Sequence, residues 1–254
     1  MLTRMILAAL VAQTPPSSDG GVLRTRDAGA AVAVDAGMDA GVKAPAPMTA
    51  EVKALVDRVQ AFYEKTQDFK ANFRQVYSYK AFKRVQTSTG TVTFRKPALM
   101  RWEYEKPSPK TFVLAGQRVF AYDPEAKLIT RAAISTNRLS ASVTFLWGQG
   151  HLADEFSIAK KACETCKGTL LEMTPLTADP RFRKVLLEVD PVTAQVIKST
   201  VIDPDGSENA ITFLDLKTNV GVEEIVFKLT PPPGTQVQDF MNAPDGPPPT
   251  SPKK

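Results

Sequence analysis

Histidine and cysteine are scarce in this chain, which has one histidine, His151, and two cysteines, Cys163 and Cys166. A Ser-His-Asp set would have to assemble around that single histidine, and a zinc site would need two ligands beyond the cysteine pair. The sequence also lacks a G-x-S-x-G turn, a glycine-rich phosphate loop and an H-E-x-x-H pair. We therefore expect a protein that is not an enzyme and has no catalytic residues, no metal and no cofactor.

Long apolar runs and a strong excess of one charge are absent too. No segment has the ~20 consecutive apolar residues that a membrane-spanning helix requires. The 32 basic and 27 acidic residues give a net charge of +5. This charge is too weak and too dispersed to indicate a nucleic-acid partner.

The composition divides the chain into four parts. Residues 1–13 have a basic residue, Arg4, before a short apolar stretch, as in a secretory signal peptide. Their cleavage site is poorly defined, so an uncleaved tail or a misplaced start remains the alternative. Residues 14–48 predict a disordered Ala/Gly/Pro-rich tether and residues 242–254 a disordered Pro-rich tail. We expect one folded domain over residues 49–241 in an exported protein.

The folded part begins with an amphipathic helix over residues 49–66, with Thr49 as its N-cap. From Phe69 the period changes to two, which is typical of a half-buried strand. Further strands, separated by short Pro- and Gly-containing turns, are expected at 89–95, 99–104, 111–114, 119–122, 128–132, 155–160, 169–174, 182–189, 196–202, 210–217 and 225–229. About ten or eleven short strands predict a mostly β, α+β fold built on an antiparallel sheet or barrel.

The segment Leu139 to Gly150 departs from this pattern because it contains no charged residue. We expect a short helix that ends near Gly148. It is either a core helix that plugs one end of a barrel or a movable cover over an apolar cavity.

The cysteine pair, Cys163-Glu164-Thr165-Cys166, has the spacing of a redox motif but lies between two predicted strands. A thioredoxin-like pair would open a helix instead. We expect a disulfide across a turn, which adds little stability because the closed loop is short.

Several motifs in their order resemble the LolA family of periplasmic lipoprotein carriers. The block Gly90 to Trp102 resembles the family's glycine, alternating strand, basic-Pro turn and aromatic-rich next strand, and the runs 103–107 and 116–124 continue it. The segment Phe227 to Gly234 resembles the family's closing "F-x-F-x-P-P-x-G" signature. The resemblance covers roughly residues 48–239.

The resemblance implies an incomplete antiparallel β-barrel with an N-terminal helix and a short helical lid over an apolar cavity for acyl chains. On this interpretation, alternation puts one set of side chains in the cavity: Phe94, Met100, Trp102, Tyr104, Leu114, Phe120 and Tyr122. The lid would supply Leu139, Val143, Leu146 and Trp147. Each of these residues is also compatible with an ordinary core.

One position departs from the family pattern. In the best-studied carriers the basic residue before the proline is an arginine that holds the lid by hydrogen bonds, whereas this chain has Lys96, preceded by Arg95. Lysine is a point charge and not a planar fork. We expect a looser lid latch at Lys96 or a shifted role for Arg95, and a solvated turn charge is the alternative.

The resemblance implies a monomeric carrier whose partners are acylated lipoproteins, an inner-membrane lipoprotein-releasing transporter and an outer-membrane acceptor. The alternative is a non-enzymatic envelope sensor or adaptor, or a carrier of another lipid, on the same fold.

Overall fold

The computed structural model describes residues 47–133 and 150–241. The predicted signal peptide, most of the tether, the 139–148 helix and the C-terminal tail therefore lie outside the described residues. Within the described ranges, no helix is both long enough and apolar enough to cross a membrane.

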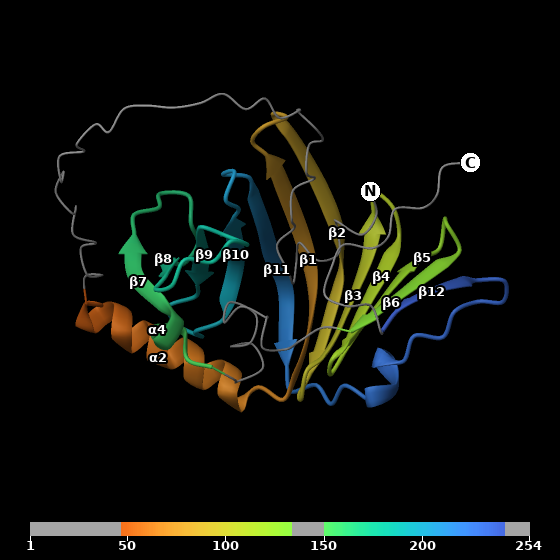
Figure 1. Cartoon of the computed structure of the whole chain (residues 1–254). Helices are drawn as coiled ribbons and strands as arrows, with labels where there is room; N and C mark the ends of the chain where they lie inside the picture. Colours follow the sequence, from red (N-terminus) through yellow and green to blue (C-terminus); the bar gives the residue numbers. More distant parts are fainter. Residues whose placement is uncertain (1–46, 134–149, 242–254) are drawn as a thin grey trace, which may run out of the picture.

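Twelve strands form one open, curved sheet in the order β12-β6-β5-β4-β3-β2-β1-β11-β10-β9-β8-β7 (Figure 1). Their bounds are β1 Asp68–Tyr79, β2 Arg84–Arg95, β3 Leu99–Lys106, β4 Lys110–Ala115, β5 Arg118–Asp123, β6 Leu128–Ala133, β7 Phe156–Lys161, β8 Thr169–Pro175, β9 Lys184–Val189, β10 Val196–Ile202, β11 Glu208–Thr218 and β12 Gln236–Phe240. The helical elements are α2 Ala50–Lys65, α4 Leu152–Glu155 and the 3-10 helix η3 Glu224–Phe227. The expected mostly β fold with an N-terminal helix is confirmed, as a sheet that does not close into a barrel.

Helix α2 forms for the reasons that the sequence indicates. Thr49 caps it, because its side chain accepts a hydrogen bond from the amide of Val52 at 3.3 Å. The stripe Val52, Val56 and Val59 is buried against β7 to β10. The face of the sheet on which α2 lies is called the inner face below, and the opposite face is the outer face.

Two predictions about the C-terminal region are wrong. Residues 225–229 do not form a strand, because η3 occupies Glu224–Phe227 and buries Phe227 on the outer face against Val113. The strand at this end is β12, Gln236–Phe240, and it pairs with β6 in parallel, so the sheet is not wholly antiparallel. Two of the five residues of β12 are glutamines, so its sequence does not show the alternation of apolar residues that predicts a strand.

Asp68, the first residue of β1, holds the loop that leads into η3. Its buried carboxylate accepts hydrogen bonds from the amides of Val220, Gly221 and Val222 at 2.7, 3.1 and 3.2 Å. The carboxylate thus satisfies three amides of one loop, and this loop begins the cover of the outer face.

Gly90 on β2 allows two aromatic rings to meet above the backbone of that strand. It pairs with Phe73 on β1 and with Tyr104 on β3. The Phe73 ring then contacts the rings of Tyr104 and Trp102, with centroids 5.0 and 4.8 Å away. A Cβ atom at Gly90 would lie 1.9 Å from the carbonyl oxygen of Glu103, so any side chain there would force β2 and β3 apart.

We predict that Gly90→Ala lowers the free energy of unfolding by about 1–3 kcal/mol, because the new methyl group overlaps a backbone oxygen. Thr91→Ala, one residue along and on the outer side of the same strand, is the control and should cost less than about 1 kcal/mol. Urea denaturation of both variants checks this. Equal stabilities of the two variants would show that the strands yield without cost.

Candidate functional site

The inner face of β1 to β4 is apolar at one end and becomes polar along the strands. At the turn between β2 and β3, Phe69, Phe94 and Met100 lie side by side on neighbouring strands, and Leu114 follows on β4. Further along β1 and β2, the next two cross-strand pairs on this face are apolar: Ala71 with Val92, then Phe73 with Gly90. The two pairs after them carry polar groups: Gln75 with Ser88, then Tyr77 with Gln86. The face therefore has an apolar end and a polar end.

The apolar end is a continuous buried cluster. Its nine members, called the inner cluster below, are Phe69, Ala71, Phe73, Val92, Phe94, Met100, Trp102, Leu114 and Ile211. Tyr104 and Phe112 pack against it and are partly buried. The Nε1 atom of Trp102 is buried and has no hydrogen-bond acceptor among the described residues.

A pocket of about 120 Å³ lies at the polar end. It is lined by Gln75, Tyr77, Tyr79, Gln86, Ser88, Tyr104, Pro107, Ser108, Lys110 and Phe112. The period of two predicted from Phe69 onward includes Gln75, Tyr77 and Tyr79, but none of them was predicted as a site residue. Phe112 was missed as well, although it has the same strand parity as Leu114.

Three polar side chains of the pocket have partners that do not line it. Gln75 Nε2 donates to Asn209 Oδ1 at 2.8 Å, and the Tyr77 hydroxyl donates to the Asp203 carboxylate. Lys110 Nζ lies 3.6 Å from Asp123 Oδ2, a loose ion pair between two mostly buried side chains. Burial raises the pKa of the Tyr104 hydroxyl, so this group remains a neutral donor and acceptor.

The structure brings together five of the predicted cavity residues. Phe94, Met100, Trp102 and Leu114 belong to the inner cluster and Tyr104 packs against it. The four predicted lid residues, Leu139, Val143, Leu146 and Trp147, lie outside the described residues.

The prediction that Phe120 and Tyr122 share this face is wrong. Leu114 pairs with Val119 across the hairpin of β4 and β5, so Phe120 lies opposite Val113 and packs with it on the outer face. Tyr122 is two residues beyond Phe120 and therefore faces the same way. The prediction placed both aromatic residues of β5 on the inner face, whereas the register of the β4–β5 turn decides on which face they lie.

Lys96 and Arg95 both have backbone partners. Lys96 Nζ donates to the carbonyl oxygens of Tyr63 and Glu64, at 3.0 and 2.7 Å, in the last turn of α2. These are carbonyls that the helix itself leaves unpaired, and a cation there also favours the helix dipole. Arg95 donates to Val222 O at 3.0 Å on the outer side of the sheet. Lys96 is therefore not a merely solvated charge, and its described contacts join the β2–β3 turn to the N-terminal helix.

The environment of Lys96 is partly apolar. Burial lowers the pKa of its ammonium group, and the nearby carboxylate of Glu64 opposes that change. The hydrogen bonds to two carbonyls must therefore compensate for the loss of water around the charge.

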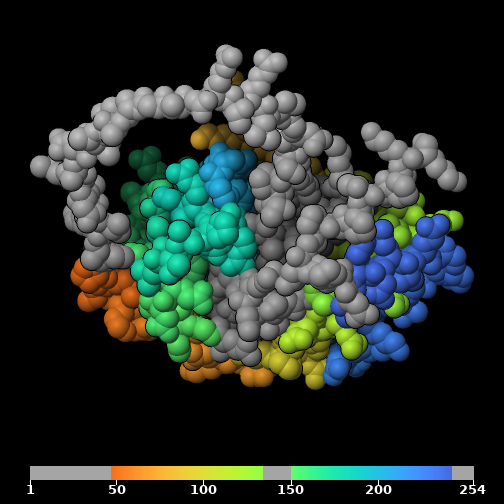
Figure 2. Space-filling model, viewed as in Figure 1, coloured from red at the N-terminus to blue at the C-terminus, as the bar shows by residue number. Residues whose placement is uncertain are grey.

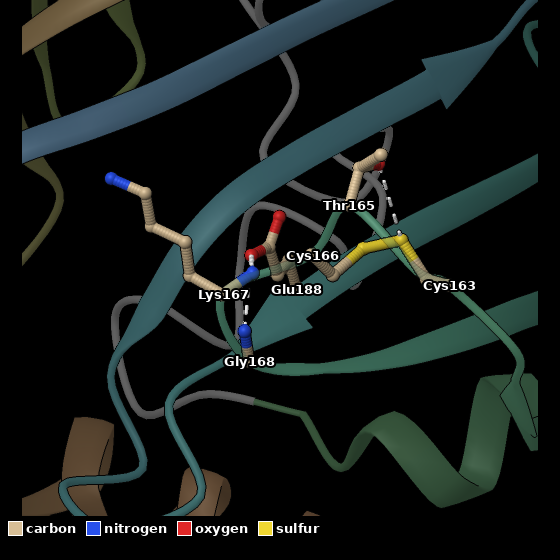
Figure 3. The surroundings of a disulfide bond; sticks show 6 residues. All are labelled: Cys163, Thr165, Cys166, Lys167, Gly168 and Glu188. Atoms are coloured by element: carbon tan, nitrogen blue, oxygen red, sulfur yellow. Dashed lines mark hydrogen bonds between the residues drawn. A yellow bond between two sulfur atoms is a disulfide. The ribbon is translucent and has the colours of Figure 1, made fainter.

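Cys163 and Cys166 form a disulfide in the exposed turn between β7 and β8 (Figure 3). Glu188 of β9 accepts hydrogen bonds from the amides of Lys167 and Gly168, at 2.6 and 3.2 Å, and so holds the end of this turn. None of these residues lines the pocket at the polar end of the inner face. In this position the disulfide cross-links two residues of a surface turn.

An open sheet with an apolar inner face defines a class of β-sheet proteins suited to hold apolar ligands. Figure 2 shows β7 to β10 and β12, the two sides of that sheet, at opposite sides of the molecule. The chain belongs to the LolA family, described as outer membrane lipoprotein carrier protein LolA, whose model matches residues 64–230.

Individual proteins are similar to this chain over most of its length. An outer-membrane lipoprotein carrier protein of Dechloromonas aromatica is 29% identical over 191 residues, which cover 75% of this chain and 90% of the relative. One from Methylococcus capsulatus is 27% identical over 183 residues, 71% of this chain and 85% of the relative. An uncharacterized conserved protein from Thermus thermophilus has a similar solved structure, with 13% identity, a TM-score of 0.49 and coverage of 74% and 98%.

We predict that Lys96→Leu lowers the free energy of unfolding by about 1 kcal/mol, because two helix-end carbonyls lose their charged donor. Lys70→Leu is the matched control, since Lys70 is exposed on β1 and its side chain has no hydrogen bond or ion pair among the described residues. Thermal or urea denaturation measures both. Indistinguishable variants would mean that water replaces Lys96 without loss.

Proposed function

We propose that this protein is a periplasmic carrier that binds the acyl chains of lipoproteins on its inner face and ferries them from the inner to the outer membrane. The observation that carries this proposal is the inner cluster, which continues into a pocket with polar walls. The relatives that are named outer-membrane lipoprotein carriers support the same cargo.

The chemistry of the inner face suits an acylated cargo. Each CH₂ group removed from water contributes ~0.8 kcal/mol and needs no directed hydrogen bond, so aromatic and aliphatic side chains suffice for the hydrocarbon. The ester linkage of an acyl chain is polar and accepts hydrogen bonds. The hydroxyl of Tyr104, which lines the pocket, is a group that such a linkage would meet.

The partners follow from the direction of transport. The carrier receives its cargo from an inner-membrane lipoprotein-releasing transporter and gives it to an outer-membrane acceptor, and it acts as a monomer without catalysis of its own. Direction then comes from graded affinity, because the carrier has to bind more tightly than the donor releases and less tightly than the acceptor takes up.

The first experiment compares two phenylalanines on opposite faces. Phe112 lines the pocket, whereas Phe120 packs on the outer face, and both are partly buried on neighbouring strands. We predict that Phe112→Ser weakens binding of a diacylated lipopeptide by about tenfold, because the acyl chain loses an aromatic contact.

Phe120→Ser should lose stability but keep its affinity for the same lipopeptide, as measured by fluorescence titration at a temperature where both variants are folded. Equal losses of affinity, or no binding by the unaltered chain, would contradict the proposal.

Lys96 also has a part in the proposed cycle. We propose that its bonds to the carbonyls of Tyr63 and Glu64 hold the N-terminal helix in place as a latch, which has to loosen when cargo enters. Because these bonds connect the β2–β3 turn to α2, their loss would free the helix end beside the apolar end of the inner face.

We predict that Lys96→Leu takes up the lipopeptide but releases it several-fold faster than the unaltered chain, whereas Lys96→Arg, which keeps the charged donor, restores retention. Stopped-flow displacement measures the release rate. Unchanged uptake and release in Lys96→Leu would remove the latch from the account.

A further inference from the structure

The tip of the hairpin between β1 and β2 exposes two large apolar side chains. Phe82, in the turn at residues 80–83, is 80% exposed, and Val85, near the start of β2, is 63% exposed. Few other large apolar side chains of the described residues are as exposed as these two. Val192 and Ile225 are as exposed, so the charge and position of the tip, and not exposure alone, have to indicate what it contacts.

The charge of this tip has one sign. Lys80, Lys83 and Arg84 are all exposed, and no acidic residue lies between Tyr79 and Gln86. None of the three cations forms an ion pair within residues 47–133 and 150–241. The tip therefore combines an aromatic side chain with three unpaired positive charges.

The hairpin extends past β3, its neighbour on one side. β1 and β2 have 12 residues each, whereas β3 pairs with β2 only from Thr89 onward. In Figure 1 the hairpin rises above the strands beside it. It lies at the polar end of the inner face, since Tyr77 and Gln86 of the same two strands line the pocket.

The base of the hairpin is braced against the turn between β10 and β11. The amide of Lys80 donates to Ser207 Oγ at 3.1 Å, and the hydroxyl of Tyr77 donates to Asp203. The rings of Tyr77 and Tyr79 lie 4.2 Å apart. The nearby acid Asp205 accepts from the amide and hydroxyl of Ser207, so the acids of this turn hold the brace and leave the cations of the tip unpaired.

We propose that the β1–β2 tip docks on an anionic lipid bilayer, with Phe82 inserted among the head groups and Lys80, Lys83 and Arg84 against the lipid phosphates. An aromatic side chain among cations on a projecting loop fits a membrane interface, because the ring can enter the head-group region while the cations stay at the anionic lipid surface. An acidic protein surface would attract the cations but offers no general place for a protruding ring. This docking brings the polar end of the inner face to the membrane.

The experiment is flotation of the full chain with phosphatidylcholine vesicles and with vesicles that also contain phosphatidylglycerol. We expect binding to the anionic vesicles only, and weaker binding as salt is added. Phe82→Ser should reduce the partition coefficient on the order of tenfold. Lys83→Glu combined with Arg84→Glu should reduce it by at least about tenfold.

Val192→Ser is the matched control, because Val192 is 82% exposed in the turn between β9 and β10, outside the hairpin. It should bind vesicles as the unaltered chain does. All variants should still take up a lipopeptide from detergent micelles, which separates this proposal from the carrier function.

Three results would overturn the proposal: no preference for anionic vesicles, full binding by Phe82→Ser, or an equal loss in Val192→Ser. If the hairpin variants bind vesicles normally but lose cross-links to envelope proteins in the native host, the tip contacts a protein and not a bilayer.

Discussion

The antiparallel pairing of β1 with β2, which runs without a break from Asp68↔Arg95 to Tyr79↔Arg84, is the constraint on which the other features depend. Because side chains alternate with a period of two, this register decides which residues of β1 and β2 belong to the inner cluster and which face outward. The same pairing places Gly90 beside Phe73, and the pairing of β2 with β3 places it beside Tyr104. A slip of one residue would move Phe69 and Phe73 to the outer face.

The register also gives the two ends of the inner face different chemistry. At one end, Phe69 and Phe94 lie beside the β2–β3 turn, where Lys96 is bonded to the C-terminus of α2. At the other end, polar pocket walls lead to the β1–β2 tip. We infer that an acylated cargo lies with its hydrocarbon toward the Lys96 end and its polar linkage toward the tip.

Alternation and caps predict local structure well here. The N-cap at Thr49, the period of β1 and most strand positions could be read from the sequence, because each rests on neighbouring residues. The side of Phe120 could not, since it depends on which residues pair across the β4–β5 hairpin. Strand β12 was missed because backbone pairing with β6, and not an apolar pattern, holds it.

The site was predictable to the same extent. Alternation, applied within the family resemblance, placed five of the predicted residues on the inner face, whereas the pocket required knowing that Gln75 and Ser88 meet across two strands. The partners of Lys96 are 32 and 33 residues away in the chain, so only the fold reveals that this side chain secures α2.

Mass spectrometry of the protein purified gently from its native host tests the central claim most directly, because it identifies whatever the inner face holds without choosing a ligand beforehand. The account predicts acylated lipoprotein bound to the chain, which the protein then passes to outer-membrane acceptor in vitro. Empty protein under these conditions, together with no transfer of added lipoprotein, would contradict it.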